Sequence, residues 1–417
     1  MLKKLHIENF RSIVEAELTF GRVNLFIGPN GGGKSNVLEA IGIVGAALGR
    51  SIDPVDLDRK GVRLSLPRLF KSTFKNRKIP KGFRLQASTK SAEYQARIVA
   101  GDDSTALQFS HESLSENGAK VFGRSPRGVK LHNVKPKIDS DSLIVVPDAK
   151  RGLFDMYKSI IELSEDASTE LSRLASYVIY SPQTAGLRGT AVDSRIIEPL
   201  GLTGGRLPAA VEEVLHAMSQ RRGTSEGEKI RQCLDLVWEA KWPKTVSVGQ
   251  QNPEIVPPQV PTTPKVLYFN DRYMKLARSW LSAFDASEGT LYLLFVATLL
   301  AHPASPPIFA LDNVDGTLNP GLVRTLVDHI VKMVAMDETT DCQVFLTSHN
   351  PTALDALDLF NDDHRVYVTK RNEDHGQTEF LRVQPPPGLT KPEWVEQKKG
   401  RNTSVLWLEG FIEGALN

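Results

Sequence analysis

The stretch VNLFIGPNGGGKSN, residues 23–36, decides the fold class of this chain. Four of its first five residues are apolar, which predicts a short buried strand. The segment Gly28–Ser35 then matches the spacing G-x-x-x-x-G-K-[ST], and apolar residues recur at helical spacing over Asn36–Leu48. A glycine-rich turn between a strand and a helix is the context of a P-loop, whose backbone N–H groups surround phosphates. A chance glycine turn explains this match poorly.

The P-loop predicts a binding site for ATP and Mg²⁺. Lys34 is expected to bring a positive charge to the β- and γ-phosphates, and the Ser35 hydroxyl to ligate Mg²⁺. The other nucleotide contacts are expected from small or polar residues of the same segment: Asn30, Gly31, Gly32, Gly33 and Asn36.

A second predicted strand, Ile308–Leu311, ends in the carboxylate of Asp312. A P-loop protein needs such a carboxylate on the strand beside the P-loop, where it holds magnesium directly or through water. Many buried strands end in Asp, so the pattern alone is weak. Together with the P-loop, it predicts Asp312 as a magnesium residue.

Two further segments place polar groups at the ends of elements. Ser287-Glu288-Gly289-Thr290 opens an apolar helix and predicts an anion site, although in isolation an ordinary N-cap explains it better. His349 follows the predicted strand Gln343–Leu346. A histidine at the carboxyl end of a strand in an α/β sheet faces the ligand crevice, which favours a functional role over a structural one.

Strands alternate with helices around the P-loop, so the fold class is α/β. We divide the chain at residues 1–190, 191–265 and 266–417, the middle part being a helical insertion with a Pro-rich loop at Gln250–Pro264. The other predicted strands are Leu2–Ile7, Glu15–Phe20, Phe83–Ala87, Glu93–Val99, Leu143–Val146, Tyr177–Tyr180 and Arg365–Thr369. The other predicted helices are Phe154–Ala175, Pro208–Ser219, Glu226–Ala240, Lys275–Leu300 with a break at Asp285–Gly289, and Pro320–Ala335.

The composition is that of a globular protein, with 417 residues, 41% hydrophobic and 24% charged, and a net charge of +2. The longest apolar run, Leu291–Ala301, is too short to span a membrane, and the N-terminus lacks the apolar region of a signal peptide. Cys233 and Cys342 have no metal-ligand spacing and are interpreted as reduced thiols. We therefore expect a cytoplasmic protein with no membrane partner.

Basic residues are concentrated in two stretches, between Arg59 and Arg84 and between Lys120 and Lys137. Such runs are usually solvated loops, and we favour that interpretation. Contact with nucleic acid is the alternative.

The motifs resemble those of a known superfamily when they are taken in order. The opening LHIENFRS, then GPNGGGKS, SEGT, IFALDN and LTSHNP look like the ABC-type ATPases. Within these, the chain resembles the RecF-like, SMC-related branch, and especially compact prokaryotic AAA-labelled ATPases of OLD-like and anti-phage defence systems. The resemblance covers roughly residues 1–50 and 265–417, with a weaker match at Tyr177–Arg188. It implies an ABC-type P-loop ATPase head with mixed sheets.

The resemblance also implies a mechanism in which two heads clamp two ATP molecules head to tail. The segment Ser287, Glu288 and Gly289 of one head would contact the γ-phosphate held by the other head. His349 would be the switch histidine that senses this phosphate. Gln183 is the candidate Q-loop glutamine, which ligates magnesium and the attacking water. Arg11 matches an arginine placed near the nucleotide, with a surface salt bridge as the alternative.

The chain departs from the family pattern at Asn313, where a Glu usually orients or deprotonates the attacking water. An amide cannot accept that proton, and the loss of a general base typically costs about 10²–10⁴-fold in rate. Asp315 or a water chain could substitute. We therefore expect slow hydrolysis, which suits a clamp that stays closed until a trigger arrives.

OLD-like nucleases carry a C-terminal Toprim domain, and the 68 residues after His349 (417 − 349) are too few for one. We therefore predict an ATP-gated sensor or scaffold that acts on a separate nuclease or toxin, in prokaryotic phage defence. A RecF-like repair clamp that binds DNA through the basic stretch at residues 59–84 is the second hypothesis. A motor driven by rapid turnover is the third, and Asn313 argues against it.

Overall fold

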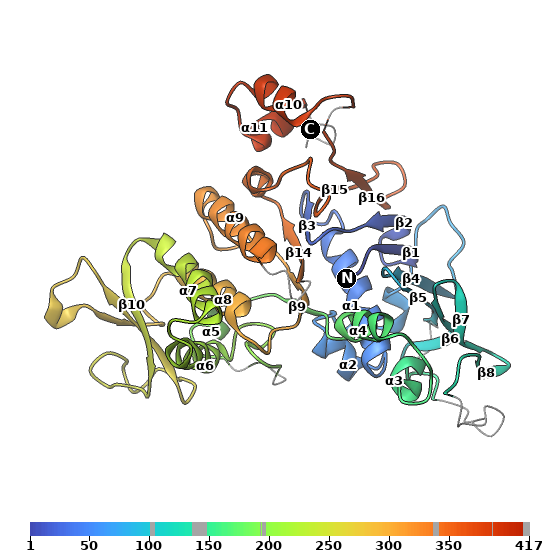
Figure 1. Cartoon of the computed structure of the whole chain (residues 1–417), viewed down its shortest axis with the longest axis horizontal. Helices are drawn as coiled ribbons and strands as arrows, with labels where there is room; N and C mark the ends of the chain where they lie inside the picture. Colours follow the sequence, from blue (N-terminus) through green and yellow to red (C-terminus); the bar gives the residue numbers. More distant parts are fainter. Residues whose placement is uncertain are drawn as a thin grey trace.

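The computed structural model describes residues 1–100, 105–135, 148–191, 193, 197–336, 342–385 and 387–411. The predicted strand Leu143–Val146 lies outside these residues. The described strands form three sheets, of seven, six and three strands. Figure 1 shows the seven-stranded sheet on one side of the molecule and the helices around α8 on the other, with the six-stranded sheet between them.

The seven-stranded sheet is antiparallel and has the order β2-β1-β4-β5-β6-β7-β8. Its strands are β1 (Lys4–Phe10), β2 (Ile13–Thr19), β4 (Gly82–Ser88), β5 (Ala92–Val99), β6 (Gln108–Glu116), β7 (Ala119–Ser125) and β8 (Gly128–Leu131). Residues along β5 alternate strictly between buried and accessible, so one face of this sheet packs on the core and the other faces solvent. The predictions of β4 and β5 are confirmed.

The six-stranded sheet has the order β16-β15-β3-β14-β13-β9. Its strands are β3 (Val23–Ile27), β9 (Val178–Tyr180), β13 (Ile308–Leu311), β14 (Gln343–Ser348), β15 (His364–Arg371) and β16 (Thr378–Arg382). All pairs are parallel except β15 with β16. Every residue of β3, β13 and β14 is buried, which explains their short apolar runs. The carboxyl ends of these three strands meet at one edge.

Helix α1 (Lys34–Gly49) lies between the two large sheets, and its residues belong to one hydrophobic cluster with both of them. Helices α8 (Glu288–Ala301) and α9 (Pro320–Met336) cover the opposite face of the six-stranded sheet. The sheet is thus buried on both sides, and its strands hold the P-loop in a fixed frame. The C-terminal helices α10 (Lys391–Lys398) and α11 (Thr403–Leu408) lie at the top in Figure 1.

Three predicted helices are shorter than expected. The segment predicted as Lys275–Leu300 contains a 3₁₀ turn at Leu276–Arg278 and strand β12 (Trp280–Ser282) before α8 begins, so this prediction is wrong over its first third. The predicted helix Phe154–Ala175 divides into α3 (Leu153–Tyr157) and α4 (Glu165–Ala175), because Ser164 caps a new helix start. The predicted helix over Glu226–Ala240 is α7 (Ser225–Leu234) followed by a 3₁₀ helix.

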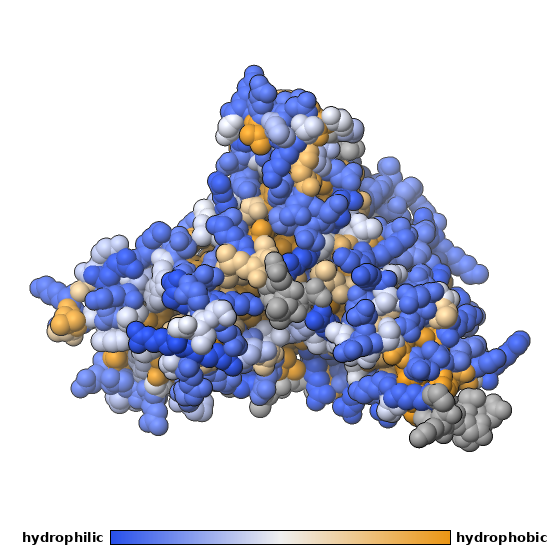
Figure 2. Space-filling view, viewed as in Figure 1, coloured by the Kyte–Doolittle hydropathy of each residue, from blue (hydrophilic) through white to orange (hydrophobic). Residues whose placement is uncertain are grey.

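The third sheet joins the predicted insertion to the part of the chain that follows it. Strand β10 (Pro243–Gly249) pairs with β11 (Val266–Asp271), which pairs with β12. The division at residue 265 stays a prediction, and these paired strands lie on either side of it. The loop after β11 exposes Tyr273, Met274 and Leu276, and Figure 2 shows hydrophobic side chains at this left-hand tip.

The remaining elements are short, apart from one helix of the insertion. They are α2 (Pro54–Arg59), α5 (Thr184–Leu187), α6 (Leu207–Gln220) and 3₁₀ helices at Pro67–Leu69 and Pro351–Ala356. Among the described residues, no helix combines the length and apolar character needed to cross a membrane.

Candidate nucleotide-binding site

A cleft of about 660 Å³ opens where β3, β13 and β14 end, and it gathers most of the predicted site residues. The predicted residues that line it are Arg11, Asn30, Gly31, Gly33, Lys34, Ser35, Asn36, Asp312, Asn313 and His349. They come from four separate parts of the sequence. The parallel sheet brings three of these parts together because β3, β13 and β14 end at the same edge, and Arg11 comes from the turn after β1 of the seven-stranded sheet.

The P-loop backbone requires glycine at several positions, and Gly28 and Gly33 are the most tightly constrained. Gly28 has φ +156°, and a Cβ atom there would lie 2.0 Å from the carbonyl oxygen of Thr369. Gly33 has φ +109°, and a Cβ atom there would lie 2.2 Å from the hydroxyl of Thr378. The strand β15 and the start of β16 therefore press directly on the loop and fix its shape, with α1 beginning at the next residue. Such a loop at a helix N-terminus fits a phosphate group.

The Lys34 ammonium group bends back over the loop. Its Nζ donates to the carbonyl oxygens of Gly28 and Pro29, at 2.7 and 3.0 Å. Burial lowers the pKa of Lys34, while the negative charges of Asp315 and Asp312 oppose that shift. A cation held only by carbonyl oxygens at the mouth of a phosphate-shaped loop is free to turn toward an anion.

Oxygen atoms suited to magnesium meet around Asp312. Its Oδ1 accepts hydrogen bonds from the hydroxyls of Ser35, at 3.1 Å, and Thr347, at 2.5 Å. The Asp312 backbone N–H donates to the carbonyl of Tyr180 on β9, which fixes the turn after β13. Hydroxyl and carboxylate oxygens are the ligand types that Mg²⁺ prefers, so this pair fits the ion.

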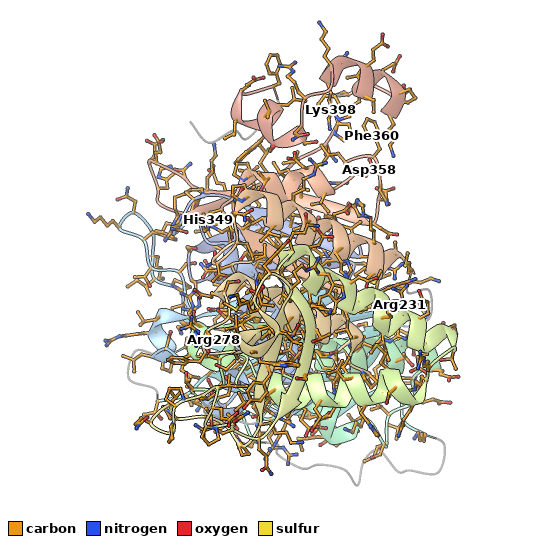
Figure 3. All side chains as sticks on the ribbon, turned by 90° about the vertical axis from the view of Figure 1, so that its left-hand side faces the viewer. Arg231, Arg278, His349, Asp358, Phe360 and Lys398 are labelled. Carbon is orange, nitrogen blue, oxygen red and sulfur yellow. The ribbon has the colours of Figure 1, made fainter. Side chains whose placement is uncertain are left out.

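Asn313 and His349 also line the cleft. Asn313 has φ +64°, a left-handed conformation that Asn tolerates better than most residues, and its N–H donates to the Thr347 hydroxyl at 2.7 Å. The carboxylate of Asp315 does not line the cleft. Its Oδ2 accepts from the backbone N–H of His349, at 3.0 Å, and lies 3.2 Å from the His349 Nδ1. Figure 3 labels His349 at the end of β14.

Arg11 pairs with the buried carboxylate of Glu39, in an ion cluster that also includes the exposed Arg63. Its Nε lies 2.6 Å from one carboxylate oxygen of Glu39, and Arg63 Nε contacts the other oxygen. The guanidinium of Arg11 stacks 4.7 Å from the ring centre of Phe70. Burial raises the pKa of Glu39, and the two arginines only partly oppose that shift. The cluster therefore places two cations at the cleft and one carboxylate beneath them.

Several residues that line the cleft were not predicted as nucleotide contacts: Ser12, Arg63, Arg68, Leu69, Lys71, Thr73, Phe74, Thr347 and Arg371. Arg63, Arg68 and Lys71 belong to the basic stretch that we interpreted as solvated loops or a nucleic-acid contact. The backbone of this stretch pairs with the turn after β1, through Arg11 N–H to Phe70 O and Ser72 N–H to Asn9 O. Arg371 Nε donates to the carbonyl of Gly31 at 3.1 Å.

The other predicted residues lie outside the cleft lining: Gly32, Gln183, Ser287, Glu288, Gly289 and Asp315. Ser287 is exposed and caps α8, where its hydroxyl accepts from the Thr290 N–H at 3.3 Å. Gln183 is exposed at the start of α5, just after β9, and the neighbouring Thr184 hydroxyl contacts the Glu288 carboxylate. The segment that follows the predicted Q-loop glutamine therefore contacts the predicted signature segment of the same chain.

Comparison with known proteins agrees with this geometry. Residues 23–355, most of the chain, match the family described as "AAA domain, putative AbiEii toxin, Type IV TA system". A stretch of 51 residues is 59% identical to the DNA replication and repair protein RecF of Magnetococcus marinus, covering 12% of this chain and 13% of that protein. A stretch of 44 residues is 43% identical to the OLD nuclease of Thermus scotoductus, covering 11% and 8%. The chain thus matches only about a tenth of the length of these curated relatives.

Two solved structures of SMC heads have a similar fold over nearly the whole of this chain. An SMC head bound to the C-winged helix domain of ScpA covers 95% of this chain and 99% of its own, with a TM-score of 0.51 and 14% identity. The SMC head with an extended coiled coil from Pyrococcus furiosus, bound to the C-terminal domain of ScpA, covers 95% and 98%, with a TM-score of 0.51 and 12% identity. Likeness at this identity concerns the fold alone. The chain belongs to the family of AAA domains described as putative AbiEii toxins of type IV toxin–antitoxin systems, and its fold is that of ABC-type P-loop ATPase heads of the SMC-related kind.

Proposed function

We propose that this protein is a slowly hydrolysing ATPase in which two copies close head to tail around ATP and Mg²⁺, and that closure controls a separate effector protein. One observation carries the proposal. The cleft holds the P-loop, Asp312 and His349, whereas the signature segment of the same chain lies outside its lining.

Different residues would contact different parts of the bound ATP and Mg²⁺. The P-loop and Lys34 would surround the phosphates, and Ser35 and Asp312 would hold Mg²⁺. Gln183 lies outside the cleft lining in this structure and would have to move toward the ion to act as a further ligand. The ion would neutralise charge on the phosphates as the terminal group is transferred. Arg11 and Arg63 would contact the nucleotide from the side opposite Asp312.

The signature segment supports a second copy. Ser287 is exposed, Gly289 is half-buried, and both lie at the N-terminus of the 14-residue helix α8. Such a helix end attracts anions, but in its own chain it does not reach the cleft. A second copy, turned head to tail, would bring its α8 to the phosphate end of this cleft.

A role in phage defence rests on the family, whose description names putative toxins of type IV toxin–antitoxin systems, and on the short stretch similar to an OLD nuclease. The substitution of Asn313 for the usual Glu favours a long-lived closed state over rapid turnover. Together these features favour a gate that holds or releases a nuclease or toxin, in the cytoplasm of a prokaryote.

The second candidate function is a DNA-binding clamp, which the short stretch similar to RecF favours. Arg68 and Lys71 line the nucleotide cleft, so reversing their charge would disturb ATP binding as well. The exposed residues Lys75, Arg77 and Lys78 are the better test. Under this hypothesis, replacing these three with Glu should abolish salt-sensitive DNA binding and leave ATP binding unchanged.

Sedimentation velocity with and without ATP and Mg²⁺ tests the proposal. The wild type should become dimeric with ATP, whereas Lys34→Ala should stay monomeric and fail to bind ATP in calorimetric titration. Ser287→Arg should bind ATP as a monomer and also fail to dimerise. Wild-type protein that stays monomeric with saturating ATP, or Ser287→Arg that loses ATP binding as severely as Lys34→Ala, would contradict the head-to-tail arrangement.

A further inference from the structure

We infer that His349, oriented by Asp315, is the general base for the ATP hydrolysis assigned to this cleft, in place of the carboxylate usual at position 313. The inference rests on the proposed function, because it requires ATP to bind beside Lys34 and Asp312.

The Asp315 carboxylate contacts His349 through one of its two oxygens. Its side chain is only 1% exposed, and Oδ2 contacts both the backbone N–H of His349, at 3.0 Å, and its Nδ1, at 3.2 Å. The other oxygen, Oδ1, accepts no hydrogen bond from the described residues. A buried carboxylate with these contacts cannot itself reach a water molecule in the cleft. It can orient the ring and stabilise a positive charge on it.

The contact with Asp315 also selects a tautomer. A carboxylate accepts a proton from Nδ1, so the Nε2 of a neutral ring carries the free lone pair. The His349 side chain is 47% exposed and lines the same cleft as Lys34 and Asp312. A base held by a second group in this way is the usual arrangement for activating a weak nucleophile.

Asn313 is the neighbour that makes such a base necessary. It lines the cleft directly after Asp312 and can orient water, but its amide does not accept a proton at neutral pH. The hydrolysis step then balances as follows. The water oxygen forms a bond to the γ-phosphorus, Nε2 of His349 takes one water proton, and the bond to the β–γ bridging oxygen breaks with its electron pair left on ADP. The proton passes from the imidazolium to the released phosphate or to solvent.

Charged side chains of both signs lie around the cleft that His349 lines. The cations that line the cleft are Arg11, Lys34, Arg63, Arg68, Lys71 and Arg371, and Asp312 is the carboxylate among the lining residues. Asp315, from the turn after β13, is the group that opposes these cations at His349. The Asp315 carboxylate would therefore stabilise the positive charge that the ring gains when it takes the proton.

The decisive test uses His349→Gln alone and together with Asn313→Glu. His349→Gln should reduce the single-turnover rate constant by about 10²–10⁴-fold, the loss typical of a missing general base, with ATP affinity within about threefold of the wild type. Restoring a carboxylate at position 313 should raise the rate of His349→Gln at least about tenfold. A histidine that only senses the γ-phosphate would not be rescued in this way. Wild-type turnover in His349→Gln would overturn the inference.

A second measurement decides the case if the doubly substituted protein does not fold. Asp315→Asn keeps the shape of the side chain but removes the charge that orients the ring, so it should lower the single-turnover rate constant and leave ATP affinity within about threefold of the wild type. A wild-type rate profile without an acid limb between pH 5 and 8, or a rate constant that Asp315→Asn leaves at the wild-type value, would overturn the inference. ATP binding by Lys34→Ala would count against the proposed function instead.

Discussion

Replacing Glu39 with Gln should weaken ATP binding about tenfold and change the stability of the fold little. Glu39 lies on α1 one turn after Ser35, is 2% exposed, and holds Arg11 and Arg63 through its two oxygens. Gln keeps the shape of the side chain but offers one acceptor oxygen, so one arginine is released. Each long side chain that must be ordered again when ATP binds costs up to about 2 kcal/mol, and a tenfold loss corresponds to about 1.4 kcal/mol.

The expected stability of Glu39→Gln follows from the direction in which burial shifts the pKa of Glu39. Burial raises the pKa of Glu39 more than the arginines lower it, so the charge on this residue does not stabilise the folded state on balance. Removing the charge should therefore lower the free energy of unfolding by no more than about 2 kcal/mol, the value of one charge-assisted hydrogen bond. Because the pKa is raised, the wild type should also lose stability relative to the variant as pH rises above the ordinary carboxyl range.

Calorimetric titration with ATP and urea unfolding of the same preparations measure both effects. The matched control is Glu373→Gln, which removes an exposed carboxylate from the turn after β15 and should leave both quantities unchanged. An ATP affinity of Glu39→Gln within threefold of the wild type would refute the positioning role. A loss of stability well above about 3 kcal/mol would show that the cluster is mainly structural.

Two further predictions concern the P-loop and the seven-stranded sheet. Gly28→Ala should abolish ATP binding, measured by calorimetry, because its Cβ would lie 2.0 Å from the Thr369 carbonyl oxygen. Gly31→Ala is strained by a φ of +78° but meets no atom within 4 Å, so it should bind better than Gly28→Ala. Equal binding by the two variants would contradict the rigid loop. Burial raises the pKa of Glu112 to about 7, with Arg124 opposing, so the unfolded carboxyl loses its proton before the folded one does. Between pH 4.5 and 7 the wild type should therefore lose up to about 3 kcal/mol of unfolding free energy relative to Glu112→Gln, and parallel urea profiles for the two proteins would refute this.

The sequence predicted the part of the site that local motifs encode. Gly28–Ser35, Asp312 and His349 each follow a short apolar strand, and parallel strands bring their carboxyl ends together whatever lies between them. The location of these three segments at the carboxyl edge of the parallel sheet could therefore be inferred from local sequence patterns.

The parts that depend on long-range pairing could not be predicted. The segment from Lys275 has apolar residues at helical spacing, but β12 pairs with β11, and this tertiary pairing overrides the local pattern. In the sequence, Arg63 and Lys71 are two members of a long basic stretch. The structure places them at the nucleotide cleft because this stretch pairs with the turn after β1. One signal was available for Glu39, since a single carboxylate within an otherwise apolar helix requires a buried partner.

Mixing two inactive variants tests the central claim, that each site is built from two copies. Lys34→Ala lacks a working P-loop and Ser287→Arg lacks a working signature, so each should hydrolyse almost no ATP alone. In a mixed head-to-tail dimer, one site combines the intact P-loop of one copy with the intact signature of the other. Because neither variant dimerises alone, the dimers of an equal mixture are mixed and each has one intact site of two, so the mixture should recover at most about half of the wild-type sites. Steady-state phosphate release that rises toward this level on mixing is the predicted result, and a rate equal to the average of the two separate variants would contradict the account.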